Sequence, residues 1–208
     1  MHPFKSATGT LAALFTAVAL FAGLAASAQA QTPVRIRGAI SALDGQILTV
    51  KTREGPEVKI KLADNYAVAA VVPITMADIK QGSYIGSAAM KQADGSLKAI
   101  EVLVFPDTMR GANEGHYPWD LMPESTMTNA TVEAVVDGTS GREMALTYKG
   151  GKQKIVVPAG VPIVTFEPGT KDMLVPGALV FVGTQQAADG SFSAGRVNVG
   201  KNGFKPPM

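Results

Sequence analysis

Residues 82–104 read GSYIGSAAMKQADGSLKAIEVLV, and residues 177–199 read GALVFVGTQQAADGSFSAGRVNV. The two stretches share a first glycine, an Ala-Asp-Gly-Ser tetrad and several apolar positions at a constant offset of 95 residues. Upstream, the same offset pairs Pro73 with Pro168 and Thr75 with Thr170. A fixed internal period indicates one supersecondary unit used twice, so we expect a duplicated architecture.

Each copy contains short segments of alternating apolar and polar residues, which predict β-strands. In the first copy these segments are 35–40, 47–53, 58–62, 84–91 and 97–105, with one helical turn at 76–80; in the second they are 130–136, 143–148, 153–157, 179–184 and 192–199. Five strands with a helical turn after the third are typical of a Greek-key barrel of the OB type, although a half-open sandwich would look similar. We therefore expect an all-β protein of two tandem small OB-like Greek-key β-barrels, residues 34–105 and 128–200, joined by an irregular linker at 106–127. A flexible tail is expected at 201–208.

The first thirty residues have the pattern of a cleavable signal peptide. Lys5 is their only charge, an apolar run covers residues 11–26, and Ser27-Ala28-Gln29-Ala30 follows. Cleavage is expected after Ala30, with Ala28 as the alternative. The competing interpretation is a membrane anchor, but the run is shorter than the roughly 20 residues that span a bilayer. We expect a mature protein of the periplasm or the extracellular space, without a transmembrane segment.

Composition narrows the possible chemistry. The chain has 19 Lys and Arg against 17 Asp and Glu, and removal of Lys5 leaves 18 against 17, a net charge of +1. This balance does not indicate a nucleic-acid-binding protein. The chain has no cysteine and two histidines, of which His2 lies in the expected signal peptide. Thiolate chemistry and a multi-histidine zinc site within one mature chain are therefore excluded, and no motif requires a cofactor.

The linker concentrates residue types that bind ligands. It contains the only tryptophan together with His116 and four acids, and its local charge is one positive against four negative. Its candidate ligand-binding residues are Arg110, Glu114, His116, Tyr117, Trp119 and Asp120. His116 with Glu114 or Asp120 could bind one cation or act as a general base. The alternative is structural, with Tyr117, Pro118 and Trp119 wedged between the barrels.

A second candidate site lies on the first expected barrel. Strand alternation places Ile36, Ile40, Leu48, Val50, Val58, Ile60 and Leu62 inside. The opposite parity places six cations on one outer face: Arg35, Arg37, Lys51, Arg53, Lys59 and Lys61. Such a face could bind a polyanion, or it could simply be solvated. It has no outward aromatic residue to stack bases, which favours an envelope polymer or lipid head group over nucleic acid.

The motifs also carry a resemblance. The first repeat includes GAI at 38–40, DG at 44–45 and ADGSLKAIEV at 93–102; the linker reads MRGANEGHYPWDL at 109–121 and STMTNA at 125–130; and KPPM stands at 205–208. Over nearly the whole mature chain this resembles small exported proteobacterial proteins of unknown function with tandem OB-like domains, some loosely labelled metal transporter permeases. The resemblance implies no activity. The permease label conflicts with the mature chain, which has no run of apolar residues long enough to cross a bilayer.

Two functions are compatible with these features. The first is an exported, non-enzymatic binding or scaffold module of the bacterial envelope that binds a partner protein, an envelope polymer or a small ligand. The alternative is a metal-binding accessory protein or a metal-dependent hydrolase centred on His116.

Overall fold

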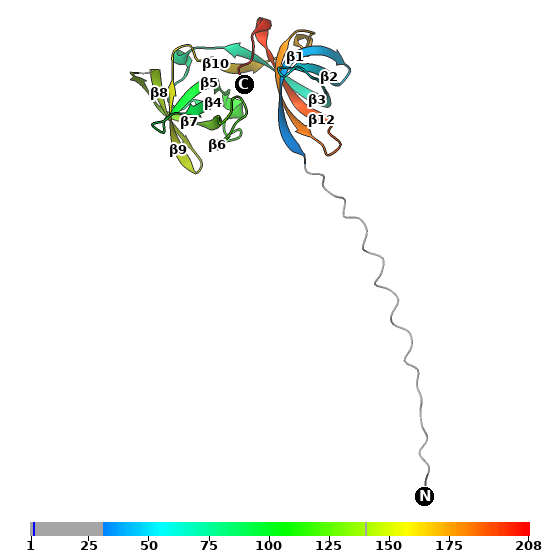
Figure 1. Ribbon diagram of the computed structural model, residues 1–208, viewed down its shortest axis with the longest axis horizontal. Coiled ribbons are helices and arrows are strands. Elements are labelled where there is room, and N and C mark those ends of the chain that lie inside the picture. The colour runs from blue at the N-terminus through cyan, green and yellow to red at the C-terminus, as the bar shows by residue number, and fades with distance from the viewer. Residues whose placement is uncertain (1, 3–30, 140) are drawn as a thin grey trace. The chain divides into compact units, whose positions relative to one another are not determined.

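The computed structural model describes His2, residues 31–139 and residues 141–208. Apart from His2, the expected signal peptide at 1–30 lies outside these residues. The described chain consists of strands and four 3-10 turns, which confirms the all-β class (Figure 1). The strands are β1 (Thr32–Asp44), β2 (Ile47–Thr52), β3 (Glu57–Pro73), β4 (Tyr84–Lys91), β5 (Leu97–Val104), β6 (Gly115–Pro118), β7 (Thr126–Gly138), β8 (Gly141–Tyr148), β9 (Gly151–Val157), β10 (Ile163–Pro168), β11 (Leu179–Gln186) and β12 (Phe192–Gly200). The 3-10 turns are η1 (Met76–Asp78), η2 (Asp107–Met109), η3 (Lys171–Met173) and η4 (Lys201–Gly203).

Five strands close into a barrel, which we call the first barrel. β1 pairs with β2, β2 with β3, β12 with β11 and β11 with β1, all antiparallel. The ring closes through a parallel pairing of β3 with β12. The first barrel therefore combines three strands from the first copy of the repeat with the last hairpin of the second copy.

The remaining hairpin of the first copy belongs to a second ring of strands. β4 pairs with β5 and with β7, β7 with β8, and β8 with β9, all antiparallel. A parallel pairing of β5 with β9, two residue pairs long, closes this second ring. The strand pairings therefore differ from the expected division at 34–105 and 128–200, because each copy of the repeat gives its β-hairpin to the other.

The exchange follows from the length of β3. The third strand was expected to end at residue 62, but β3 has 17 residues and continues to Pro73, about 55 Å of extended chain. Its second half pairs antiparallel with β10, a strand that the sequence analysis missed. Val71 lies opposite Phe166, its own equivalent at an offset of 95, while Ala69–Pro168 and Pro73–Val164 are equivalent pairs on either side. The two copies are therefore related here by a pseudo-two-fold axis.

Each ring encloses its own apolar cluster. The first barrel buries six of the seven residues expected inside, and the seventh, Val58, is partly buried. The second ring buries residues such as Ile85, Met144 and Ile155 at 0% exposure. A third cluster joins Val71 and Val164 of the pseudo-two-fold pairing with Leu103 and Met208.

Two irregular segments are more ordered than expected. The tail at 201–208 was expected to be flexible, but Met208 is 3% exposed in the third cluster and Lys201 forms an ion pair with Glu167 at 2.7 Å. The tail has two large apolar side chains, Phe204 and Met208, that pack in the third cluster. Its glycine and proline residues had suggested a segment without such contacts. The linker at 106–127 contains η2 and β6, and β6 pairs with β7.

Candidate functional site

The first barrel carries a cluster of lysines and arginine on the outer side of β2 and β3. Lys51 on β2 and Lys59 and Lys61 on β3 are exposed, as is Arg53 just after β2. Alternation along the strands turns them outward because Val50, Val58 and Ile60 point into the core. Within the described chain none of the four takes part in an ion pair within 4 Å. We call Lys51, Arg53, Lys59 and Lys61 the basic face.

The other two predicted cations, Arg35 and Arg37 on β1, are not free. Arg37 is 9% exposed and donates two hydrogen bonds to Asp120, Nη1 to Oδ2 at 3.2 Å and Nη2 to Oδ1 at 2.8 Å. The Arg35 guanidinium lies 3.9 Å from the centroid of the Trp119 ring, and Tyr117 contacts Trp119 edge-on. The two candidate sites of the sequence analysis therefore meet: linker side chains cover the β1 part of the expected cationic face.

The ion pair makes Asp120 more acidic. Burial acts to raise the pKa of Asp120, but the hydrogen bond and charge of Arg37, together with the charge of Arg35, outweigh it and hold the pKa below its usual value. This carboxylate therefore stabilises the fold at neutral pH, and the contribution is lost as the pH falls through its lowered pKa.

Replacing Asp120 with asparagine is expected to reduce the free energy of unfolding by about 1–2 kcal/mol at pH 7, because Arg37 keeps its charge at a nearly buried site and loses its carboxylate. This corresponds to a fall of about 3–6 °C in Tm, measured by circular dichroism. Asp107→Asn is the control, since that carboxylate is 92% exposed in its pair with Arg110 and its loss should change Tm little. Equal effects of both variants would contradict a structural role of the Arg37 pair.

A pocket of about 370 Å³ adjoins the basic face. Lys51, Arg53 and the tail residue Lys205 supply three cations to its lining, which contains no acidic residue. Its other lining residues are small or apolar: Gly38, Ala39, Thr52, Leu179, Val180 and Pro206. The tail is fixed here because Arg53 donates a hydrogen bond from Nη2 to the Pro206 carbonyl at 2.9 Å. Sequence reasoning missed Lys205 because it placed the tail outside the fold.

The remaining linker candidates each have a different contact partner. Arg110 donates to the Gly82 carbonyl at 3.0 Å, and Oε1 of Glu114 accepts from the Lys149 backbone N–H at 2.9 Å. His116 Nδ1 is 2.8 Å from Oγ1 of Thr128, and its ring stacks against Tyr148. Burial lowers the pKa of His116.

The convergence on His116 that the metal-dependent alternative requires is not observed among the hydrogen bonds of the described residues. Glu114 and Asp120 take part in other contacts, and neither is bonded to the imidazole. Residues 31–139 and 141–208 contain no group of three or more His, Asp and Glu side chains placed to hold a metal ion.

One ionisable residue that the sequence analysis missed is Glu101 on β5. It is 1% exposed, and neither carboxylate oxygen has a hydrogen-bond partner among the described residues. Burial raises the pKa of Glu101 to about 7, while the charges of Arg37 and Arg53 act in the opposite direction. A signal was available in the sequence: residues 100–105 read IEVLVF, so this acid interrupts an otherwise apolar run.

Comparison with known proteins gives no relative from which a role could be transferred. No family model, curated protein or solved structure matches the chain. In the part of the chain that the structure describes, no helix is long and apolar enough to span a membrane.

Proposed function

We propose that this protein is a non-enzymatic binding module of the bacterial envelope that holds an anionic polymer on the basic face of its first barrel. The observation that carries the proposal is the exposure of Lys51, Arg53, Lys59 and Lys61 side by side with no ion-pair partner among the described residues. Export rests on the signal-peptide pattern of residues 1–30. The proposed binding needs no cofactor.

The order of strands supports an OB-like architecture for both rings. In the first barrel the order is β1-β2-β3-β12-β11, with a parallel pairing only between β3 and β12. In the second ring β7-β8-β9-β5-β4 repeats this order, with a parallel pairing only between β9 and β5. OB barrels bind extended polymers across the face of their second and third strands, which in the first barrel carry the lysines.

The chemistry of the face favours a polyanion without bases. Flexible ammonium groups attract carboxylate, sulfate and phosphate groups at several geometries, which suits a polymer of repeating charge. Glu57, which lies opposite Lys51 in the β2–β3 pairing, is partly engaged because its Oε1 accepts a hydrogen bond from Ser41 at 2.6 Å. No aromatic side chain stands among the outward residues of β2 and the paired part of β3, so base stacking is not provided.

The proposal is tested by reversing three charges of the face together. The variant Lys51→Glu, Lys59→Glu, Lys61→Glu is expected to bind immobilised dextran sulfate and polygalacturonate at least about 100-fold more weakly at 100 mM salt, since each contact contributes on the order of 1 kcal/mol. Binding of the unmodified protein should weaken steeply as salt rises.

The matched control changes the same net charge elsewhere. Lys91, Lys98 and Lys149 are exposed and lie outside the basic face, so their replacement by glutamate should weaken binding much less. Equal losses in the two triple variants would show that only net charge matters. Absence of binding by the unmodified protein to either polymer at low salt would refute the proposal.

A further inference from the structure

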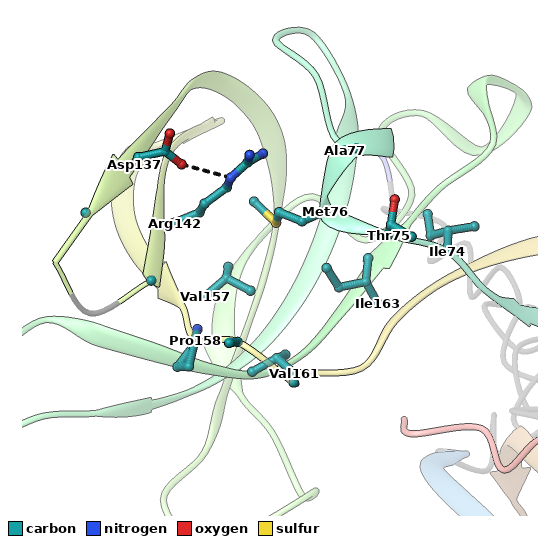
Figure 2. A pocket seen from close by; sticks show the side chains of 14 residues that line it. Ile74, Thr75, Met76, Ala77, Asp137, Arg142, Val157, Pro158, Val161 and Ile163 are labelled. Atoms are coloured by element: carbon teal, nitrogen blue, oxygen red, sulfur yellow. Dashed lines mark ion pairs between the residues drawn. The ribbon is translucent and has the colours of Figure 1, made fainter.

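The second ring has a pocket at one end, between η1, the end of β7, the start of β8 and the end of β9. Its volume is about 560 Å³, within the range of small-molecule sites. The walls are largely apolar, with Met76 from η1, Val157 from β9, Ile163 from β10 and Val161 from the segment between β9 and β10 (Figure 2). Asp137 and Arg142 also line this pocket and form an ion pair from Nε to Oδ1 at 3.0 Å.

The pseudo-two-fold relation shows what fills the equivalent place in the first barrel. At an offset of 95, Val161 corresponds to Tyr66 and Met76 to Lys171. Tyr66 is 8% exposed and belongs to the core of the first barrel, and the Lys171 ammonium lies 4.4 Å from the centroid of its ring. The first barrel therefore closes this end with an aromatic ring of its own, where the second ring has a valine.

The polar side chains at the equivalent ends of the first barrel and the second ring also differ. Gln46 donates a hydrogen bond at 2.7 Å to the carboxylate of Asp64, which precedes Tyr66 by two residues on β3. By strand register Gln46 corresponds to Arg142, since Ile47 pairs with Lys61 as Glu143 pairs with Val156. At the offset of 95, Asp64 corresponds to Ala159. The second ring therefore has a stronger donor than the first barrel and no carboxylate at the position of Asp64; its Arg142 pairs through Nε with Asp137, which comes from β7.

Arg142 remains available for a ligand. Its shortest contact with Asp137 is made through Nε, and its two terminal nitrogens donate no hydrogen bond to the described residues. A guanidinium with two parallel donors suits a carboxylate, which it binds in a bidentate manner. Met76 and Arg142 point towards one another from η1 and β8 (Figure 2), so an aromatic ring placed beside the thioether would lie close to the guanidinium.

We propose that this pocket binds a small aromatic carboxylate of one or two rings. The ring occupies the apolar space that Tyr66 fills in the first barrel, and the carboxylate takes the place of the missing Asp64 group on the terminal nitrogens of Arg142. Asp137 holds the guanidinium through Nε and leaves the outer nitrogens for the ligand. The site is independent of the basic face, which lies on other strands.

The test is a calorimetric titration of the mature chain, residues 31–208, with 2-naphthoate and with the neutral 2-naphthylmethanol. We expect saturable binding of 2-naphthoate. In a ¹H–¹³C NMR spectrum, the ligand should also shift the methyl signal of Met76, which is assigned by its absence from the spectrum of the Met76→Leu variant. Arg142→Gln should weaken 2-naphthoate about tenfold or more and leave the neutral alcohol unchanged. Val161→Tyr should block both compounds by filling the space.

Val175→Tyr is the matched control, because it adds the same ring at a valine that is 52% exposed and outside the pocket. It should leave both affinities unchanged, as should the triple variant of the basic face. The proposal is overturned if 2-naphthoate does not bind, if the Met76 signal is unaffected, or if Arg142→Gln weakens acid and alcohol alike. If Val161→Tyr does not fold, the proposal is still tested by the acid and alcohol affinities of Arg142→Gln and by the Met76 methyl signal.

Discussion

A chain shortened to the first copy of the repeat, residues 31–106, is expected to be unfolded as a monomer. In the whole protein, β1, β2 and β3 close into a barrel only with β11 and β12, and the truncation removes both. The first core loses Val180, Val182, Ala194, Val197 and Val199. Their burial contributes on the order of 10 kcal/mol, comparable to the whole stability of a typical domain.

The measurement is circular dichroism with thermal melting at micromolar concentration, with residues 31–208 as the folded reference. Light scattering on the same sample reports the oligomeric state. A dimer of the fragment at high concentration would agree with the exchange, because each copy can supply the hairpin that the other lacks. A monomer that melts cooperatively would contradict it, since it would show that one copy closes on itself.

Glu101→Gln is expected to stabilise the protein at pH 8, against the usual direction of core substitutions. The pKa of this carboxyl is about 7 in the folded state, above the ordinary 4.5, so the folded state retains a proton that the unfolded state has released. The stability of the unmodified protein should therefore fall as pH rises from about 4.5 to 7. The whole difference is on the order of 3 kcal/mol, or about 6–12 °C in Tm, and glutamine removes it.

Thermal unfolding of both proteins from pH 5 to pH 8 tests this. The two should differ little at pH 5, and the Tm of Glu101→Gln should lie higher at pH 8. Glu54→Gln serves as the control, because Glu54 is exposed and its loss should not change how Tm varies with pH. A glutamine variant that is less stable at pH 8 would show that Arg37 and Arg53 stabilise the ionised carboxylate beyond the cost of burying it.

Much of the local structure could be predicted from the sequence. Alternation identified the inward residues of β1, β2 and β3, because the side of a strand on which a residue lies depends on its neighbours in sequence. The second half of β3 escaped this reasoning. Residues 67–72 read AVAAVV, and Ala69–Val72 are all buried, so no polar residue marks an outer side.

The candidate sites were accessible only in part. Parity correctly placed Lys51, Lys59 and Lys61 outside, yet it treated Arg37 in the same way although Asp120, 83 residues away, buries it. Lys205 of the tail lines the pocket beside the basic face, and the buried Glu101 lies near the charges of Arg37 and Arg53, which are distant in sequence. Such contacts depend on how the rings and the tail pack, which no local pattern contains.

The sequence by itself determined the duplication, the all-β class and the inward and outward positions of most strands, since these follow from a repeat period and from the two-residue period of a strand. Only the tertiary structure decided which hairpin completes which ring. The two copies present equivalent pairing edges, so either hairpin is compatible with either set of three strands. The antiparallel pairing of β3 with β10 decides between these arrangements, because it directs each hairpin away from the three strands of its own copy. Tyr66 and Val161 are a difference in sequence, but only the tertiary structure showed that the tyrosine belongs to the core of the first barrel while the valine lines a pocket of the second ring.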